Sequence, residues 1–138
     1  MSLLSVFSIT GSGMVAESQR LVAVASNLAN ANSAGDSTGE PYRAREVIFQ
    51  TVSSDGGDDP ASLGIGGVRV AGVTDSKEPL RQVYDPGSQF ADSNGYVRMS
   101  NVNPIDEMVN MISAQQNYQA DLEAFNVAKT LLQKTLTI

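Results

Sequence analysis

Large apolar residues recur at every seventh position near both ends of this chain, and that spacing is the strongest constraint on its fold. Near the N-terminus they are Phe7, Met14, Leu21 and Leu28, and near the C-terminus they are Met111, Tyr118, Phe125 and Leu132. A seven-residue repeat places side chains along one face of an α-helix. The two repeats predict long terminal helices that pack together as a coiled-coil pair.

The N-terminal helix, expected over residues 1–34, carries little charge. Its only charged residues are Glu17 and Arg20. Small residues such as Gly11 and Ala25 stand four positions after large ones, which suits close contact between helices. A solvated helix face is usually charged, and the polar residues here carry amides and hydroxyls instead. This pattern favours burial of the helix against other chains.

Three asparagines in this segment are given two different roles. Asn27 is expected to set the register between packed helices, as a buried amide does in coiled coils. Asn32 is expected to end the helix, with Asn30 as the other candidate for that role, since Asn tolerates the left-handed conformation found there.

The C-terminal helix is expected over residues 104–138 and has clear start signals. Asn103 can cap it, Pro104 suits its first turn, and Asp106 and Glu107 complement the positive end of the helix dipole. Leu122 widens the apolar stripe. Roughly 30 residues without an internal Gly or Pro would give a rod of about 45–50 Å.

The middle segment, residues 35–103, contains most of the glycines and four of the five prolines. Short β-like runs occur at 42–52, 67–73, 80–84 and 96–99, with turn-forming dipeptides between them. Residues 53–65 are expected to form a mobile loop. The predicted fold class is therefore α+β, with a small, mainly β domain inserted between the two terminal helices.

Composition excludes most catalytic and cofactor chemistry. The 138 residues include no Cys and no His, so zinc sites, iron–sulfur clusters, thiol nucleophiles and His-dependent triads are excluded. The acidic residues Asp55, Asp58 and Asp59 lack the spacing of a calcium loop. A net charge of −6 argues against nucleic-acid binding. We therefore expect no metal, no cofactor and no enzymatic activity.

The N-terminus does not look like a cleaved secretion signal. It has no basic region and no sustained apolar run, because Gly11, Ser12 and Gly13 interrupt it. No stretch approaches the roughly 20 apolar residues of a membrane span.

Three groups of motifs, in order along the chain, resemble those of bacterial flagellar rod and hook proteins. The first is SQRL followed by ASNLANAN, the second contains VYDPG, AD and GYV, and the third contains NVN, EMVNMI and YQA. These matches lie at residues 18–21, 25–32, 83–87, 91–92, 95–97, 101–103, 107–112 and 118–120. The resemblance covers nearly the whole chain and is closest to the proximal-rod members of the family. Ser33, where Thr is usual, and Gln116–Asn117, where an Arg is common, depart from the family pattern.

The resemblance implies a structural subunit of the flagellar rod, which carries torque from the rotor to the hook. Such subunits are exported by the flagellar type III apparatus without a cleaved signal, and their terminal helices pack around a central export channel. Implied partners are other copies of the chain, other rod proteins, the rotor ring and export gate at the base, and the distal rod above. The expected assembly residues are Phe7, Met14, Leu21, Ala25, Asn27, Leu28, Asn30, Met111, Tyr118, Leu122, Phe125 and Leu132.

A second reading of the same sequence remains open. The two helices could pair only with each other in a discrete soluble adaptor or secreted binding module, with the loop at 53–62 contacting a partner. An enzyme working through carboxylates alone is a third reading, but no pair of acids converges on a pocket in the sequence pattern.

Overall fold

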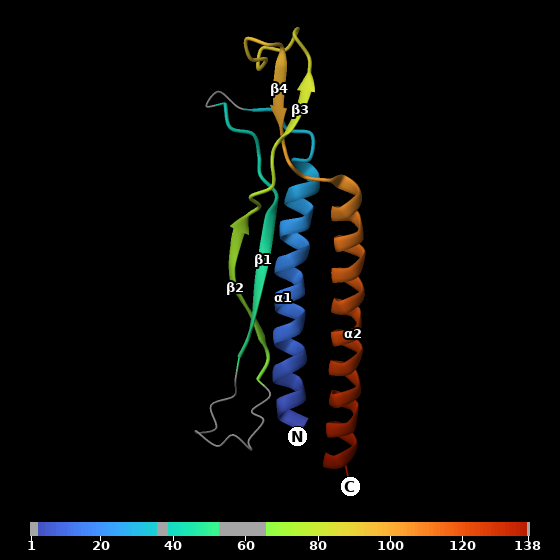
Figure 1. The fold of residues 1–138 in the computed structure, drawn as a ribbon. Coiled ribbons are helices and arrows are strands. Elements are labelled where there is room, and N and C mark those ends of the chain that lie inside the picture. Colours follow the sequence, from blue (N-terminus) through green and yellow to red (C-terminus); the bar gives the residue numbers. More distant parts are fainter. Residues whose placement is uncertain (1–2, 36–38, 53–65, 138) are drawn as a thin grey trace. The chain divides into compact units, whose positions relative to one another are not determined.

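The computed structural model describes residues 3–35, 39–52 and 66–137. Two long helices lie at the ends of the chain, with short strands between them (Figure 1). The elements in order are α1 (Leu3–Ala29), β1 (Arg45–Thr51), β2 (Val68–Asp75), β3 (Arg81–Tyr84), β4 (Tyr96–Met99) and α2 (Pro104–Leu136). This confirms the predicted α+β class. The predicted loop at 53–65 and the acids Asp55, Asp58 and Asp59 lie outside the described residues.

Helix α2 begins as its sequence predicts. The Oδ1 atom of Asn103 accepts a hydrogen bond from the Ile105 N–H at 3.1 Å, and its Nδ2 donates to Asp106 Oδ2 at 2.7 Å. Asn103 therefore caps the helix, and Asp106 lies in the first turn, where the helix dipole favours a carboxylate.

Helix α1 ends at Ala29, five residues earlier than predicted. The hydrogen bonds that end it also differ from the predicted ones. The side-chain Nδ2 of Asn30 donates to Ser26 O at 2.8 Å, and the Asn30 N–H donates to both Ser26 O and Asn27 O. No described residue other than glycine has a positive φ, so the expected left-handed Asn ending is wrong. Asn30 instead satisfies the last carbonyls with its own amide, and the turn at 30–32 follows.

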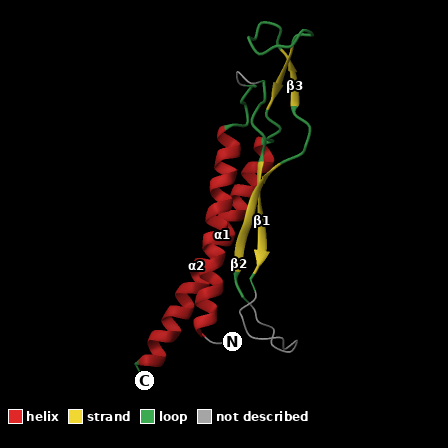
Figure 2. Cartoon of the chain, turned by 90° about the vertical axis from the view of Figure 1, so that its left-hand side faces the viewer, coloured by secondary structure: helices red, strands yellow, loops and turns green. Residues whose placement is uncertain are grey.

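The chain divides into two compact units, and both helices contribute to each. Unit 1 consists of Met1–Leu21, Val47–Gly72 and Ile112–Ile138. In it, α1 and α2 run antiparallel and side by side (Figures 1 and 2). The rings of Phe7 and Phe125 meet edge-on with centroids 4.9 Å apart. Ala16, Ala114 and Ala128 are buried. Small buried side chains allow two helices to approach closely.

A close contact holds the start of β2 against α1 in unit 1. The Val68 N–H donates to Ser12 Oγ at 3.0 Å, and Ser12 Oγ donates to Ile9 O within the helix at 2.7 Å. A Cβ atom placed on Gly67 would collide with the Ser12 side chain. Gly67 therefore allows the backbone to lie against α1, which is a common reason for glycine beside a strand.

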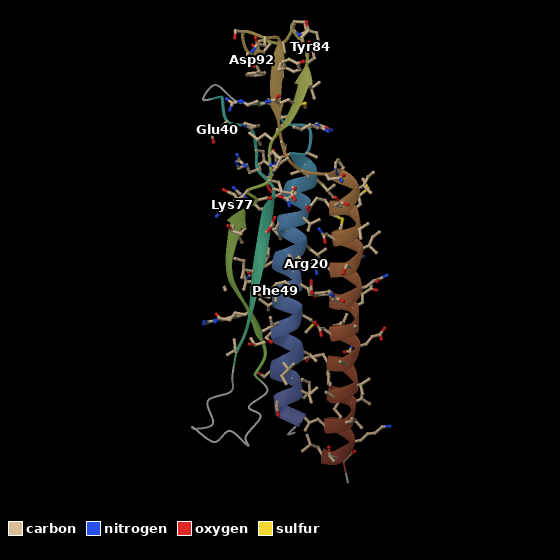
Figure 3. The ribbon with its side chains drawn as sticks, viewed as in Figure 1. Arg20, Glu40, Phe49, Lys77, Tyr84 and Asp92 are labelled. Atoms are coloured by element: carbon tan, nitrogen blue, oxygen red, sulfur yellow. The ribbon has the colours of Figure 1, made fainter. Side chains whose placement is uncertain are left out.

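Unit 2 consists of Val22–Glu46 and Val73–Met111. Strands β3 and β4 pair antiparallel, with Arg81 opposite Met99 and Tyr84 opposite Tyr96. The other edge of β4 is bridged to the chain that follows α1, because Gly35 N–H donates to Arg98 O and Ser100 N–H donates to Ser33 O. Tyr84 and Asp92 lie at the far end of the hairpin (Figure 3). Among the described residues of this unit, the buried side chains are Ala23, Val24, Asn27, Ala31, Pro41, Ser76, Val97, Ser100 and Val102.

Candidate assembly surfaces

The exposed side chains of α1 are uncharged in both units. In unit 1 they are Ser8, Val15, Ser18 and Gln19, and in unit 2 they are Val22, Ala25 and Ala29. Val15 is 59% exposed and Val22 is 69% exposed. An exposed helix face normally carries charged residues. This face has two exposed valines and no charged residue, which indicates contact with another protein surface.

Helix α2 exposes large apolar residues in the same way. In unit 2, Ile105, Met108 and Val109 are exposed at spacings of three and four, which places them on one side of the helix. In unit 1 the exposed large apolar residues of α2 are Ile112, Leu122, Val127, Leu131 and Leu136. Exposed apolar residues in this number are unusual on a helix that faces only water.

The residues predicted at the helix–helix seam have intermediate exposure in this chain. This applies to Phe7, Met14, Leu21, Leu28, Met111, Tyr118, Phe125 and Leu132. Phe7 and Phe125 contact each other directly. Ala25 and Leu122 are exposed, Asn30 is half-buried, and Asn27 is buried. The predicted set thus mixes residues that point inward with residues that remain open to other chains.

Asn27 of unit 2 makes four side-chain hydrogen bonds and is 1% exposed. Its Oδ1 accepts from the Arg45 N–H at 2.8 Å and from the Tyr42 hydroxyl at 2.9 Å. Its Nδ2 donates to Arg45 O at 3.0 Å and to Glu107 Oε2 at 3.1 Å. The amide therefore joins α1, the start of β1 and the start of α2 within one chain.

A second polar contact, which the sequence analysis did not single out, lies in unit 1. Asn117 Nδ2 donates to Glu17 Oε1 at 3.0 Å, and Arg20 lies 3.5 Å from Glu17 Oε2 in an ion pair. Asp121 follows Asn117 by one helical turn and lies over Gly13, where a Cβ atom would collide with its carboxylate. The available signal was that Glu17 is the only acid in the first 34 residues.

The surroundings of Asp121 favour the protonated form of its side chain. Desolvation by burial raises the pKa of Asp121 above its ordinary value of 3.8, and the negative charge of Glu17 raises it further. Asp121 has no hydrogen bond or ion pair with any other described residue, whereas Glu17 has Arg20 and Asn117. An acid with a raised pKa can mark a functional position.

The described residues offer little else that could do chemistry. Over residues 3–35, 39–52 and 66–137, no three His, Cys, Asp or Glu side chains gather as a metal site would require. No helix in the described part of the chain has the length and apolarity needed to cross a membrane. The features that the described residues do show are helix contacts and exposed apolar helix surfaces.

Comparison with known proteins agrees with that description. The family model described as "Flagella basal body rod protein" matches residues 7–35, and the one described as "Flagellar basal body rod FlgEFG protein C-terminal" matches residues 93–138. A protein named flagellar basal-body rod protein FlgC from Salmonella typhimurium is 47% identical over 138 residues. Proteins of the same name from Yersinia enterocolitica and from Buchnera aphidicola of Acyrthosiphon pisum are 49% and 44% identical. In each case all of this chain aligns with 98% of the relative.

Proposed function

Because the chain belongs to the FlgC family of flagellar basal-body rod proteins, we propose that it assembles into the rod through the exposed uncharged face of α1 and the exposed apolar residues of α2. The chain is a structural subunit of the basal-body rod, and its function belongs to flagellar motility. The proposal concerns how the subunit packs: α1 and α2 form a coiled-coil pair that contacts the helices of neighbouring subunits.

The observation that carries this proposal is the uncharged, partly apolar face of α1. Val15 and Val22 lie seven positions apart, and neither has a charged exposed neighbour on this helix. Polymers form when a subunit contacts the next one head to tail and the contacts do not close into a ring. Dense packing of long helices resists deformation, so such a polymer can carry torque.

We further propose the setting in which the subunit acts. It is exported by the flagellar type III apparatus without a cleaved signal and surrounds the export channel together with neighbouring copies and other rod proteins. The rotor ring and the export gate lie at its base, and the distal rod lies above it. No catalysis is assigned to the chain, since the family is one of structural rod proteins.

Two matched substitutions in unit 2 test the assembly surface. Val22→Asp places a charge on the open face of α1, and Val73→Asp places the same charge on β2, where the valine is also exposed. We expect Val22→Asp to remove the subunit from isolated basal bodies and to stop swimming. Val73→Asp should leave both near wild type, since it lies outside the helical faces.

Both variants must first be shown to fold like the wild type. Far-UV circular dichroism of both purified variants should match that of the wild type, because neither valine is buried. If Val22→Asp enters the rod and supports normal motility, the helices satisfy each other within one chain. The reading as a discrete soluble adaptor would then replace the assembly proposal for these faces.

A further inference from the structure

Unit 1 contains a cavity of about 330 Å³ whose walls are mostly apolar. Ile9 and Ala16 of α1, Phe49 of β1 and Val68 of β2 line it. Two carboxylates, those of Glu17 and Asp121, line the same cavity. An apolar cavity that also presents carboxylates fits a ligand with a long apolar stem and a cationic head.

The charges in this cavity are not balanced within the chain. Arg20 forms an ion pair with Glu17 at 3.5 Å, but Glu17 Oε2 is buried and accepts no hydrogen bond from the described residues. Asp121 has neither a hydrogen bond nor an ion pair within the described part of the chain. Of the two acids, only Glu17 therefore has a cationic partner among the described residues, and a partly buried carboxylate without a partner is costly.

The same chain offers a cation with suitable surroundings. Lys134 is exposed near the end of α2, seven residues after Val127 and three after Leu131, so the three share one face of the helix. Val127 and Leu131 are both at least half exposed. Lys134 has no ion pair with any residue for which the structure gives a position. This face combines an apolar surface with a free ammonium group.

We propose that the Glu17–Asp121 cavity of one subunit receives Lys134 of a second copy of this chain. The stem of Lys134 would lie along the apolar walls, with Val127 and Leu131 covering the opening, and its ammonium would pair with Asp121. This inference rests on the proposed assembly function and adds a specific lateral contact to it. Complementary charge at a subunit contact fixes which surfaces meet and in which register.

Chemical cross-linking of isolated basal bodies tests the pairing directly. A carbodiimide joins a carboxylate to an amine with no spacer, so it links only groups that already touch. We expect a covalent dimer of the chain on a denaturing gel. Mass spectrometry should find a peptide that joins Asp121 or Glu17 to Lys134. The dimer should disappear in Lys134→Gln and persist in Lys129→Gln, which removes a neighbouring lysine outside the Val127–Leu131 face.

The amount of subunit in basal bodies isolated from cells that carry each variant gives a quantitative test. Asp121→Asn and Lys134→Gln should each lower the amount of subunit in basal bodies by about tenfold, the usual minimum for a close charge pair across an interface. The double variant should lose no more than either single one. Glu123→Gln, which removes an exposed acid from the same helix, should match the wild type.

Several results would overturn the pairing. One is a wild-type amount of Lys134→Gln in the rod with an unchanged cross-linked dimer. Another is cross-linking of Asp121 only to lysines of other rod proteins, which would make the occupant a different subunit. Protection of Asp121 from carbodiimide by Mg²⁺ or Ca²⁺ alone, without any dimer, would make the cavity a cation site. Failure of the wild-type chain to enter basal bodies would instead contradict the proposed function.

Discussion

The side chain of Asn27 hydrogen-bonds both backbone polar groups of Arg45. The Arg45 N–H donates to Asn27 Oδ1 at 2.8 Å, and Asn27 Nδ2 donates to Arg45 O at 3.0 Å. One side chain thus makes the pair of bonds that a neighbouring strand would make, and it fixes where β1 begins relative to α1. The same amide group also reaches Glu107 at the start of α2.

Replacing this amide should destabilise unit 2. We expect Asn27→Ala to lower the free energy of unfolding by about 3 kcal/mol, because it leaves several buried donors and acceptors without partners. Urea unfolding followed by circular dichroism measures the change. Asn27→Asp is a second probe of the same contact, since it keeps the acceptor for Arg45 and Tyr42 but loses the donor and adds a charge beside Glu107. It should also be destabilising, and a neutral effect of both variants would contradict the role given to the amide.

Two glycines of the β1–β2 region should respond differently to the same methyl group. Gly67→Ala would push Ser12 from its position and disturb its bond to the Val68 N–H, whereas a Cβ on Gly72 meets no atom within 4 Å. We expect a loss of about 1–2 kcal/mol for Gly67→Ala and little change, or a small gain, for Gly72→Ala. Chemical denaturation of the two variants side by side gives the difference. Equal effects would mean that the strand segments of unit 1 do not depend on the contact with Ser12.

The raised pKa of Asp121 predicts how stability changes with pH. The folded-state pKa lies above the unfolded value, so the favourable contribution of the protonated group is full below about pH 4 and is lost as pH rises through the folded pKa. Glu17 from α1 is the charged group that acts on it, Thr51 from β1 lines the same cavity, and Asn117 lies one helical turn before it on α2. We expect Asp121→Asn to be more stable than the wild type at pH 7 and nearly equal to it near pH 3.5. Thermal unfolding across this pH range measures the difference.

This prediction also separates the two roles of Asp121. If it serves only the fold, Asp121→Asn at pH 7 should raise both stability and incorporation into the rod. The proposed pairing with Lys134 requires opposite signs, with a more stable free subunit and a weaker assembly. A variant that is less stable than the wild type at pH 7 would contradict the pKa direction and its cause.

The sequence predicts the elements of this fold well because their signals are local. Asn103 and Pro104 mark the start of α2, and the observed strands β1 to β4 lie within or beside the four β-like runs. The end of α1 was missed because Asn30 can stop a helix either by its backbone or by its side chain, and only the structure shows the bond to Ser26 O. Local propensity does not distinguish these two endings.

The polar contacts could not be predicted in the same way, because they join residues far apart in the chain. Asn27 and Glu107 are 80 positions apart, and Glu17 and Asn117 are 100 positions apart. The seven-residue spacing indicates that α1 and α2 have complementary faces, but it gives neither their relative direction nor their offset. The residues around Glu17 and Asp121 therefore become a candidate site only when antiparallel packing brings them together.

The β3–β4 hairpin allows a test of backbone strain against side-chain collision. Gly95 has a φ of +83°, and a Cβ there would lie 2.8 Å from the Tyr84 ring, which itself packs edge-on against Tyr96 at 5.3 Å. Gly95→Ala should destabilise the hairpin by about 2 kcal/mol, while Gly87→Ala, which has only an ordinary contact, should have little effect. Hydrogen exchange of the Asp85 amide, which donates to Gly95 O, reports the local opening. In a Tyr84→Ala background the collision with the ring is gone, but the positive φ and the 3.2 Å approach to Pro86 Cβ remain. We expect Gly95→Ala to cost about half as much there, and an unchanged cost would mean that the Tyr84 ring contributes nothing to the effect.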